Sequence, residues 1–273
     1  MRTGMAAVCA LAALFAGAAR ADDRTDCRPE IIGSATVSTV ADSRTVSLSD
    51  GREVRLAGIE IPNDSDNAAA ARAALEKLLV GQEKHLVGQE KHLAGQEVQL
   101  LRMGPGADRY GRVVAGIAMA AGEKPVQLEL LAQGHALVAS NVGNTGCAMA
   151  FLSAEKAARV SGVGLWGSSY YPTKKAEDPA GILAVRGRFA VVEGKVLSVR
   201  ESGATIYVNF GRRWSEDFTV TTLKRNERTF EAAGLPLKKL AGRQVRVRGT
   251  VEERGGPWIE AVHPGQIEIA EQP

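Results

Sequence analysis

The chain reads TVSLSDGREVRLA over residues 45–57, and this stretch decides its fold. Apolar and polar residues alternate on both sides of Asp50-Gly51, and Asp-Gly between two alternating runs is the strongest short signal for a β-hairpin. The same alternation continues on the N-terminal side, over residues 35–39. Residues 34–60 are therefore predicted to form β-strands joined in part by a tight hairpin.

Outside the hairpin, the spacing of apolar residues switches between helical and strand periods. Residues 66–80 are rich in Ala and Leu, and Asn63, Ser65 or Asp66 is placed to cap a helix there. Further strands are predicted over residues 98–102 and 113–119, and further helices over residues 126–133 and 148–160. This mixture predicts an α+β domain that is mainly β with helices.

A second β-rich unit follows a polar segment. Residues 168–181 (SSYYPTKKAEDPAG) contain two prolines and mixed charges, and we predict a linker there. Beyond it, strands are predicted over residues 189–200, 204–210, 218–221, 243–252 and 258–261, with helical residues 223–234 between the third and the fourth. Five strands with one inserted helix are typical of an OB-type barrel. Residues 182–273 are therefore predicted to form a second small OB-like β-barrel.

The N-terminal 21 residues have the layout of a secretory signal peptide. Arg2 precedes an uncharged run over residues 5–19, and Ala19-Arg20-Ala21 matches an A-x-A cleavage site. The alternative is a membrane anchor, but fifteen apolar residues are short for a span of ~20. We predict cleavage after residue 21 and export to the periplasm or the medium, with no transmembrane segment in the mature chain.

Cleavage changes both the cysteine count and the charge. Cys9 leaves with the signal peptide, and the remaining Cys27 and Cys147 are expected to pair because the destination is oxidising. The alternative is two buried free thiols. Two arginines also leave, so the net charge of the 273-residue chain falls from +3 to +1. Residues 22–181 then carry −3 and residues 182–273 carry +4. Neither unit has the strong basic bias of a protein that coats DNA.

A tandem repeat interrupts the first unit. Residues 80–86 (VGQEKHL) recur identically as residues 87–93 and recur again, degraded, as residues 94–100. His85 and His92 lie seven residues apart, which places them on one helical face as possible ligands. Neither has a second ligand at metal-like spacing, so we favour a duplication that extends a helix over residues 80–100.

Two motifs resemble one known family. Residues 54–63 read VRLAGIEIPN ahead of a helix, and residues 108–112 read DRYGR before a strand. Together with the hairpin, they resemble the staphylococcal-nuclease (thermonuclease) family, which carries D-G-D-T, R-L-x-x-x-D-x-P-E and D-x-Y-G-R in this order. The resemblance covers about residues 33–167. It implies that residues 22–167 form a five-stranded OB-type β-barrel with helices.

The resemblance also implies a reaction and its residues. The family hydrolyses phosphodiester bonds of DNA and RNA with Ca²⁺, and Arg55 and Arg112 stand where its two catalytic arginines would be. Guanidinium groups suit phosphate, and carboxylates suit Ca²⁺. Glu60 and, more weakly, Asp42 are the candidate metal ligands. Ion pairing under the barrel mouth is the other interpretation of the two arginines.

Two positions depart from the family pattern. Arg44 replaces a metal-binding aspartate, and a cation there repels Ca²⁺. Asn63 stands at the position of the general-base glutamate, and an amide cannot take a proton at neutral pH. Asp64 and Asp66 could substitute as carboxylates, but capping of the following helix is the more plausible role.

Further candidates bind substrate rather than react with it. Arg109 and Tyr110 belong to the DRYGR motif, and Tyr110 either packs or lines the site. In the second unit, Trp214 follows Arg212-Arg213, a combination that suits stacking and phosphate contacts in an OB groove.

Three hypotheses result. The first is a family member with weak or no nuclease activity that keeps an anion or nucleic-acid site. The second is an active Ca²⁺-dependent nuclease with rewired carboxylates. The third is an envelope module in which the repeat helix or the C-terminal unit binds a protein partner.

Overall fold

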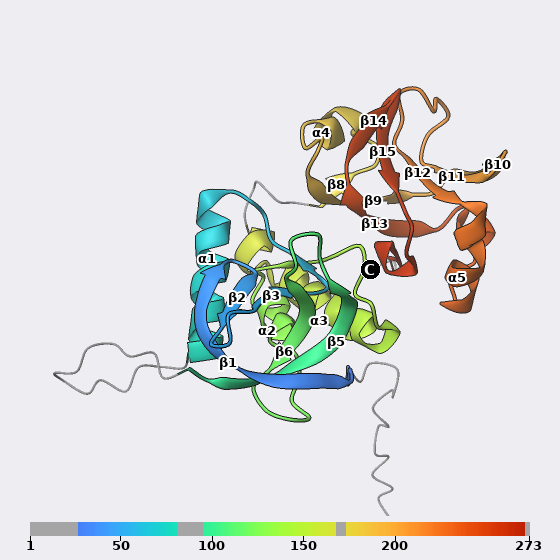
Figure 1. Ribbon diagram of the computed structural model, residues 1–273. Coiled ribbons are helices and arrows are strands. Elements are labelled where there is room, and N and C mark those ends of the chain that lie inside the picture. The colour runs from blue at the N-terminus through green and yellow to red at the C-terminus, as the bar shows by residue number, and fades with distance from the viewer. Residues whose placement is uncertain (1–26, 81–94, 168–172, 271–273) are drawn as a thin grey trace, which may run out of the picture.

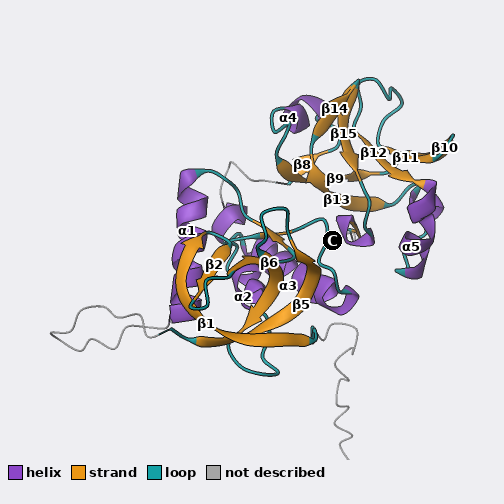
Figure 2. Ribbon diagram, in the orientation of Figure 1, coloured by secondary structure: helices purple, strands orange, loops and turns teal. Residues whose placement is uncertain are grey.

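The computed structural model describes residues 27–80, 95–167 and 173–270. It contains a barrel domain with helices and a second, β-rich unit beside it (Figures 1 and 2). The predicted signal peptide lies outside the described residues, as do His85 and His92 of the repeat. Within the described ranges, no helix is long and apolar enough to cross a membrane.

Five strands close the barrel in the order β1-β2-β3-β6-β5. They are β1 (Ile31–Asp42), β2 (Thr45–Leu48), β3 (Glu53–Leu56), β5 (Glu97–Ala107) and β6 (Val113–Ala118). The predicted hairpin is confirmed, because Val46 pairs with Val54 across β2 and β3. Both residues are fully buried, as the alternation requires. β3 and β6 run parallel, whereas the other neighbours are antiparallel. The predicted α+β fold with a closed five-stranded barrel is confirmed.

Three helices pack against the barrel: α1 (Ser65–Val80), α2 (Val126–Ala132) and α3 (Thr145–Ser161). Asp64 caps α1, since its carboxylate accepts a hydrogen bond from the backbone N–H of Asn67 at 3.0 Å. The fully buried side chain of Gln127 fixes α2 to the barrel. Its amide donates to the carbonyl oxygens of Ala57 and Ala115, and its oxygen accepts from the N–H of Ile117.

A short strand pair connects the barrel to α3. β4 (Ile59–Glu60) follows the barrel strand β3 directly and pairs with β7 (Leu137–Val138). Gly58 makes the turn between β3 and β4 with a φ of +77°. A Cβ atom there would lie 3.0 Å from the ring of Phe151 on α3, so the turn also needs glycine for space.

The repeat differs from its prediction where it can be followed. We expected a helix over residues 80–100, but β5 already begins at Glu97, so the end of the third copy is a strand. Leu100 is buried in the barrel core, and burial overrides the helical spacing of the duplicated sequence. Residues 81–94 lie outside the described residues.

The predicted disulfide is present. Cys27 and Cys147 are bonded and both are buried, with Cα atoms 4.2 Å apart. Cys147 lies in the first turn of α3, where its N–H donates to the cap residue Asn144. The bond therefore ties the start of the described chain to α3.

The second unit consists of two sheets around one core. Their orders are β16-β13-β9-β8 and β10-β11-β12-β15-β14. The strands are β8 (Lys174–Lys175), β9 (Phe189–Lys195), β10 (Ser198–Ser202), β11 (Thr205–Asn209), β12 (Thr219–Leu223), β13 (Gln244–Thr250), β14 (Glu252–Arg254), β15 (Gly256–Glu260) and β16 (Ile267–Ile269). Two short helices, α4 (Pro179–Leu183) and α5 (Glu227–Ala232), accompany them. Phe218 and Phe230 are fully buried between these elements.

Three details of the second unit differ from the sequence-based expectation. Its described strands form two sheets, of five and four strands, where we predicted five strands in an OB-like barrel. The run over residues 189–200 is two strands, because the chain turns between β9 and β10. The predicted linker over residues 168–181 is shorter, since β8 pairs with β9 and Asp178 caps α4. The edge strand β8 and the capped helix α4 were predicted as a linker because edge strands and helix caps contain the same polar residues as loops.

Candidate functional site

Three arginines meet at one end of the barrel because three neighbouring strands carry them. Arg55 lies on β3, Arg44 precedes β2, and Arg112 precedes β6. The N–H of Leu56 donates to the carbonyl of Arg44 at 2.8 Å, and β3 pairs with β6 from Val54 onward. The three arginines, on or next to these neighbouring strands, therefore lie at the same end of the barrel.

Arg55 is the central member of this group. It is half-buried, and burial followed by the positive charges of Arg44 and Arg112 lowers its pKa below the ordinary value. The carboxylates of Glu60 and Asp42 act in the opposite direction. An arginine still stays protonated at neutral pH. The site therefore holds three positive charges close to the carboxylates of Asp42, Glu60 and Asp108.

Arg44 forms an ion pair with Glu60. Its guanidinium Nη1 contacts Oε2 of Glu60, and both side chains are largely shielded from solvent. The backbone N–H of Arg44 also donates to the carboxylate of Asp42 at 2.8 Å. Both candidate metal ligands, Glu60 and Asp42, are thus hydrogen-bonded to Arg44.

Arg112 is held by Asp108 of the DRYGR motif. Its guanidinium Nε and Nη2 both lie 2.8 Å from Oδ2 of Asp108. The other carboxylate oxygen accepts from the N–H groups of Tyr110 and Arg112, which closes the turn around Gly111. Desolvation raises the pKa of Asp108, but these hydrogen bonds outweigh it and hold the pKa below the ordinary value. Asp108 therefore holds the guanidinium of Arg112 in place and also stabilises the turn.

Tyr110 lies on the surface at this end of the barrel. It is 67% exposed, which excludes a core packing role. The guanidinium carbons of Arg109 and Arg112 lie 4.7 and 5.1 Å from its ring centre. Nη2 of Arg109 also donates to the Tyr110 hydroxyl at 2.6 Å. The motif thus presents an exposed aromatic ring between two cations.

A cleft of about 410 Å³ opens beside the Arg44–Glu60 pair. Asn63 and Asp64 line it on the barrel side, with Asn63 exposed. Gly187–Phe189 and Thr250 line it from the second unit. Asp64, one of the carboxylates considered as a substitute, is engaged as the cap of α1. No local sequence pattern indicates the wall that the second unit contributes, because two segments distant in sequence form it.

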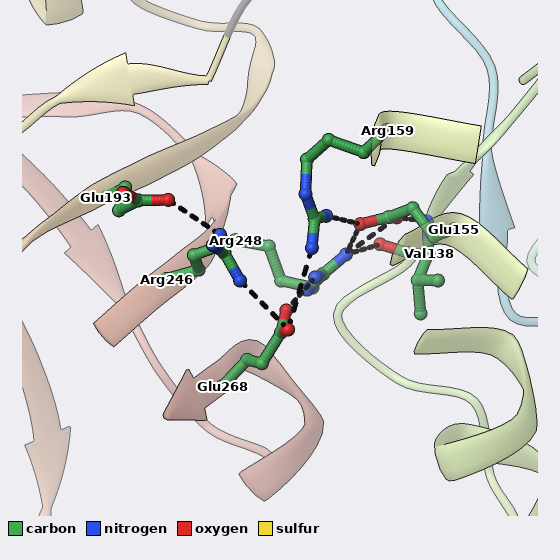
Figure 3. A network of polar contacts seen from close by, with 7 residues as sticks. All are labelled: Val138, Glu155, Arg159, Glu193, Arg246, Arg248 and Glu268. Atoms are coloured by element: carbon green, nitrogen blue, oxygen red, sulfur yellow. Dashed lines mark hydrogen bonds and ion pairs between the residues drawn. The ribbon is translucent and has the colours of Figure 1, made fainter. Parts of the chain in front are cut away.

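A buried ion network joins the two units (Figure 3). Arg248 of β13 and Glu155 of α3 are both fully buried, and Nη1 of Arg248 lies 2.8 Å from Oε2 of Glu155. Glu268 of β16 bridges Arg248, Arg246 and Arg159 at 3.3, 3.2 and 3.6 Å. Arg246 also reaches Glu193 at 2.7 Å, and Arg159 reaches Glu155 at 3.1 Å. Three arginines and three glutamates therefore balance their charges across the interface.

The same network reaches the candidate site through the backbone. Oε2 of Glu155 accepts from the N–H of Val138 at 2.6 Å, and Arg248 donates to the Val138 carbonyl at 3.4 Å. Val138 belongs to β7, which pairs with the strand that carries Glu60. The interface that places the second unit over the cleft thus also anchors the strand beneath the Arg44–Glu60 pair.

Residues 53–168 match the family model of staphylococcal nuclease homologues. Most of the barrel domain is therefore similar to this family. The matched range includes Arg55, Glu60, Asn63 and Arg112, whereas Asp42 and Arg44 precede it. The family is one of nucleic-acid-hydrolysing, typically Ca²⁺-dependent proteins. A comparison of the chain with curated proteins found no match.

The nuclease-homologue site does not fit a calcium ion. Ca²⁺ takes about 6–8 oxygen ligands, several of them carboxylate oxygens. Glu60 is already paired with Arg44, and the positive charge of this guanidinium repels a cation that approaches the same carboxylate. In the ranges that the structure describes, no three His, Cys, Asp or Glu residues group in a way that could hold a metal ion.

The remaining candidate residues lie elsewhere. Trp214, Arg212 and Arg213 belong to the loop between β11 and β12 of the second unit. None of them lines the cleft beside Glu60. Arg213 is paired with Glu216 at 2.9 Å, so it is less available to a ligand than Arg212. The candidate residues thus divide into a group on the nuclease homologue and a group on the second unit.

Proposed function

We propose that the nuclease-homologue site binds phosphate groups of nucleic acid and hydrolyses them weakly or not at all. The ion pair between Arg44 and Glu60 carries the proposal, because a guanidinium there takes the electrostatic place of the metal cation. Arg55 and Arg112 supply the charge-assisted hydrogen bonds that phosphate requires. The site keeps the groups that bind the substrate and lacks those that activate water.

Each retained residue has a defined part in binding. Arg55 offers a guanidinium that is already half-desolvated, so less water is displaced when a phosphate enters. Arg112 can exchange its contact with Asp108 for a phosphate oxygen, and Tyr110 can stack against a base or sugar. Asn63 can donate a hydrogen bond to the ligand, but it cannot remove a proton from water.

The first test measures binding and cleavage separately. The mature protein is expected to leave labelled DNA and RNA uncut in Ca²⁺ and in EDTA, and to bind the dinucleotide pdTpdT in calorimetry at low salt. Arg55→Gln and Arg112→Gln should each weaken this binding about tenfold or more, because each removes a hydrogen bond from a charged group. Arg52→Gln is the matched control, since Arg52 is exposed and pairs with Asp50 in the hairpin turn.

Robust cleavage that depends on Arg112 and stops in EDTA would contradict this proposal and favour an active nuclease with rewired carboxylates. Absence of any salt-sensitive binding would favour a protein-interaction module. Cleavage and binding measurements on one protein preparation therefore distinguish the two alternatives.

A second test restores the missing groups. Arg44→Asp combined with Asn63→Glu is expected to create calorimetrically detectable Ca²⁺ binding and to raise Ca²⁺-dependent cleavage above that of the unmodified protein. The reason is that the exchange frees Glu60, adds a carboxylate and supplies a base. Arg44→Gln is the control, because it removes the cation without adding a ligand. A double variant that binds no Ca²⁺ would show that the geometry, and not only the side chains, has changed.

We also propose that the protein works outside the cytoplasm. The signal-peptide layout of residues 1–21 supports export, and the buried Cys27–Cys147 disulfide fits an oxidising compartment.

A further inference from the structure

One face of the five-stranded sheet in the second unit lines a groove of about 970 Å³. The opposite face of this sheet supplies Ile206, Val208, Val220 and Ile259 to the core. Strand alternation therefore sends the intervening side chains into the groove. The groove shares no lining residue with the cleft beside Glu60, so it is a separate site.

Two cross-strand rows of mostly polar residues cross the groove face. One cross-strand row consists of Ser198, Asn209, Thr219 and Trp258, and the next consists of Arg200, Tyr207, Thr221 and Glu260. These rows offer hydroxyl and amide groups that can donate and accept hydrogen bonds. The hydroxyl of Thr219 has no hydrogen-bond partner among the described residues. Because the groove also contains apolar surface, it suits a ligand that combines flat rings with polar groups.

Three aromatic residues line the groove, two on interior strands of the sheet and one on the loop between β11 and β12. Trp214 lies on the loop between β11 and β12 and is 72% exposed. Such exposure is unusual for so large an apolar ring. Tyr207 is half-buried on β11. Trp258 is covered by the guanidinium of Arg254, whose central carbon lies 3.5 Å from the ring centre. The Arg254 side chain is itself 61% exposed, so it presents a flat, cationic platform to the groove.

Two arginines and one glutamate of the groove lining are exposed and make no ion pair with another described residue. The arginines are Arg200 and Arg212, and the glutamate is Glu260. Glu201 is the acidic counterpart nearest in sequence, but Lys224 and Lys238 lie 2.8 and 2.9 Å from its carboxylate oxygens. Its negative charge is therefore offset locally, and Glu260 is the remaining acidic residue of the lining.

The Glu201 cluster predicts a measurable titration. Hydrogen bonds from Lys224 and Lys238 lower the pKa of Glu201 to about 2, from an ordinary 4.5. Because the folded-state pKa is depressed, the cluster stabilises the protein above pH 4.5, and this contribution is lost as the pH falls toward 2. NMR titration of the Glu201 carboxyl should give a midpoint near 2. Lys238→Met should move the midpoint upward, and an unperturbed midpoint in the unmodified protein would contradict the contacts.

We propose that this groove binds single-stranded nucleic acid. Bases stack on Trp214, on Tyr207 and on the Arg254–Trp258 pair, while Arg200 and Arg212 contact the phosphates. Stacking on aromatic rings and on guanidinium planes, combined with backbone contacts to cations, is how single strands are bound with little sequence preference. A duplex is excluded because its bases are paired and its stacked faces are covered.

The proposal extends the function proposed for the nuclease homologue without depending on it. A strand held in the groove raises the local concentration of phosphates for the barrel site, but each site binds through its own residues. Loss of one can therefore be observed while the other persists.

The test uses the full mature protein in EDTA with a fluorescein-labelled dT12 oligonucleotide. Anisotropy should report binding that weakens with salt, and tryptophan emission should be quenched. Trp214→Ala is expected to weaken binding about tenfold, and Trp214→Phe should largely restore it because a stacking ring returns. Arg200→Ala should reduce the slope of log K against log salt by about 0.7. Arg186→Ala is the matched control, since Arg186 is similarly exposed, is paired with Glu253 and does not line the groove.

Three results would overturn the proposal. They are unchanged dT12 affinity in Trp214→Ala, equal binding of a duplex, and equal binding of heparin, which carries charge without bases. Arg55→Gln should weaken dinucleotide binding about tenfold or more yet leave the quenching of Trp214 by dT12 intact. A different pair of results would also reject the groove. If Arg55→Gln abolished the quenching and Trp214→Ala kept the full affinity for dT12, all binding would belong to the barrel site.

Discussion

Replacing Arg248 by methionine is expected to lower the free energy of unfolding by about 3–5 kcal/mol. The reason is that Glu155 would keep its buried charge and lose its closest partner, while Arg248 and Glu155 are both fully shielded from water. Arg159 would remain 3.1 Å from Glu155 but is itself shared with Glu268. Urea unfolding followed by circular dichroism and tryptophan fluorescence measures the loss.

Two variants separate the charge from the packing. Arg248→Met with Glu155→Gln removes both charges and keeps an acceptor for the N–H of Val138, so much of the stability should return. Arg102→Met breaks an exposed pair with Glu30 and should cost less than about 1 kcal/mol. If Arg248→Met lowers the free energy of unfolding no more than Arg102→Met does, the network does not hold the two units together.

The same variant should also uncouple the two units. With the network intact, the probes are expected to report one transition. In Arg248→Met, the second unit can separate from α3, so the two probes should no longer coincide. A change in dinucleotide binding is expected as well, because the network anchors β7 beside the strand that carries Glu60.

Removing the disulfide should have an effect of similar size. Cys27→Ser with Cys147→Ser is expected to cost about 3–5 kcal/mol, because the bond closes a loop with a sequence separation of 120 and restricts the unfolded chain. Unfolding in urea with and without dithiothreitol measures this cost. The doubly substituted protein is the control, since its stability should not respond to the reductant. An unmodified protein that is equally insensitive to complete reduction would contradict a stabilising role.

The sequence by itself predicted the elements whose contacts are local. The β2–β3 hairpin followed from alternation and Asp-Gly, and the cap of α1 was narrowed to Asp64 and its neighbours. The disulfide was predicted because only two cysteines remain after the expected cleavage and the expected compartment is oxidising. The motifs placed Arg55 and Arg112 at the same end of one barrel, because the family pattern encodes strands that are neighbours in space.

The tertiary structure alone decided which charges meet. Alternation on β13 places Arg246 and Arg248 opposite the core residues Val245 and Val247, which predicts two solvated arginines. Helix α3 of the barrel domain covers that face, so Arg248 is fully buried against Glu155. Likewise, no spacing rule relates Arg44 to Glu60, yet their pairing determines whether the site can hold a metal. Alternation reports which way a side chain points along its own strand. Burial and charge pairing depend on what a distant segment brings to that face.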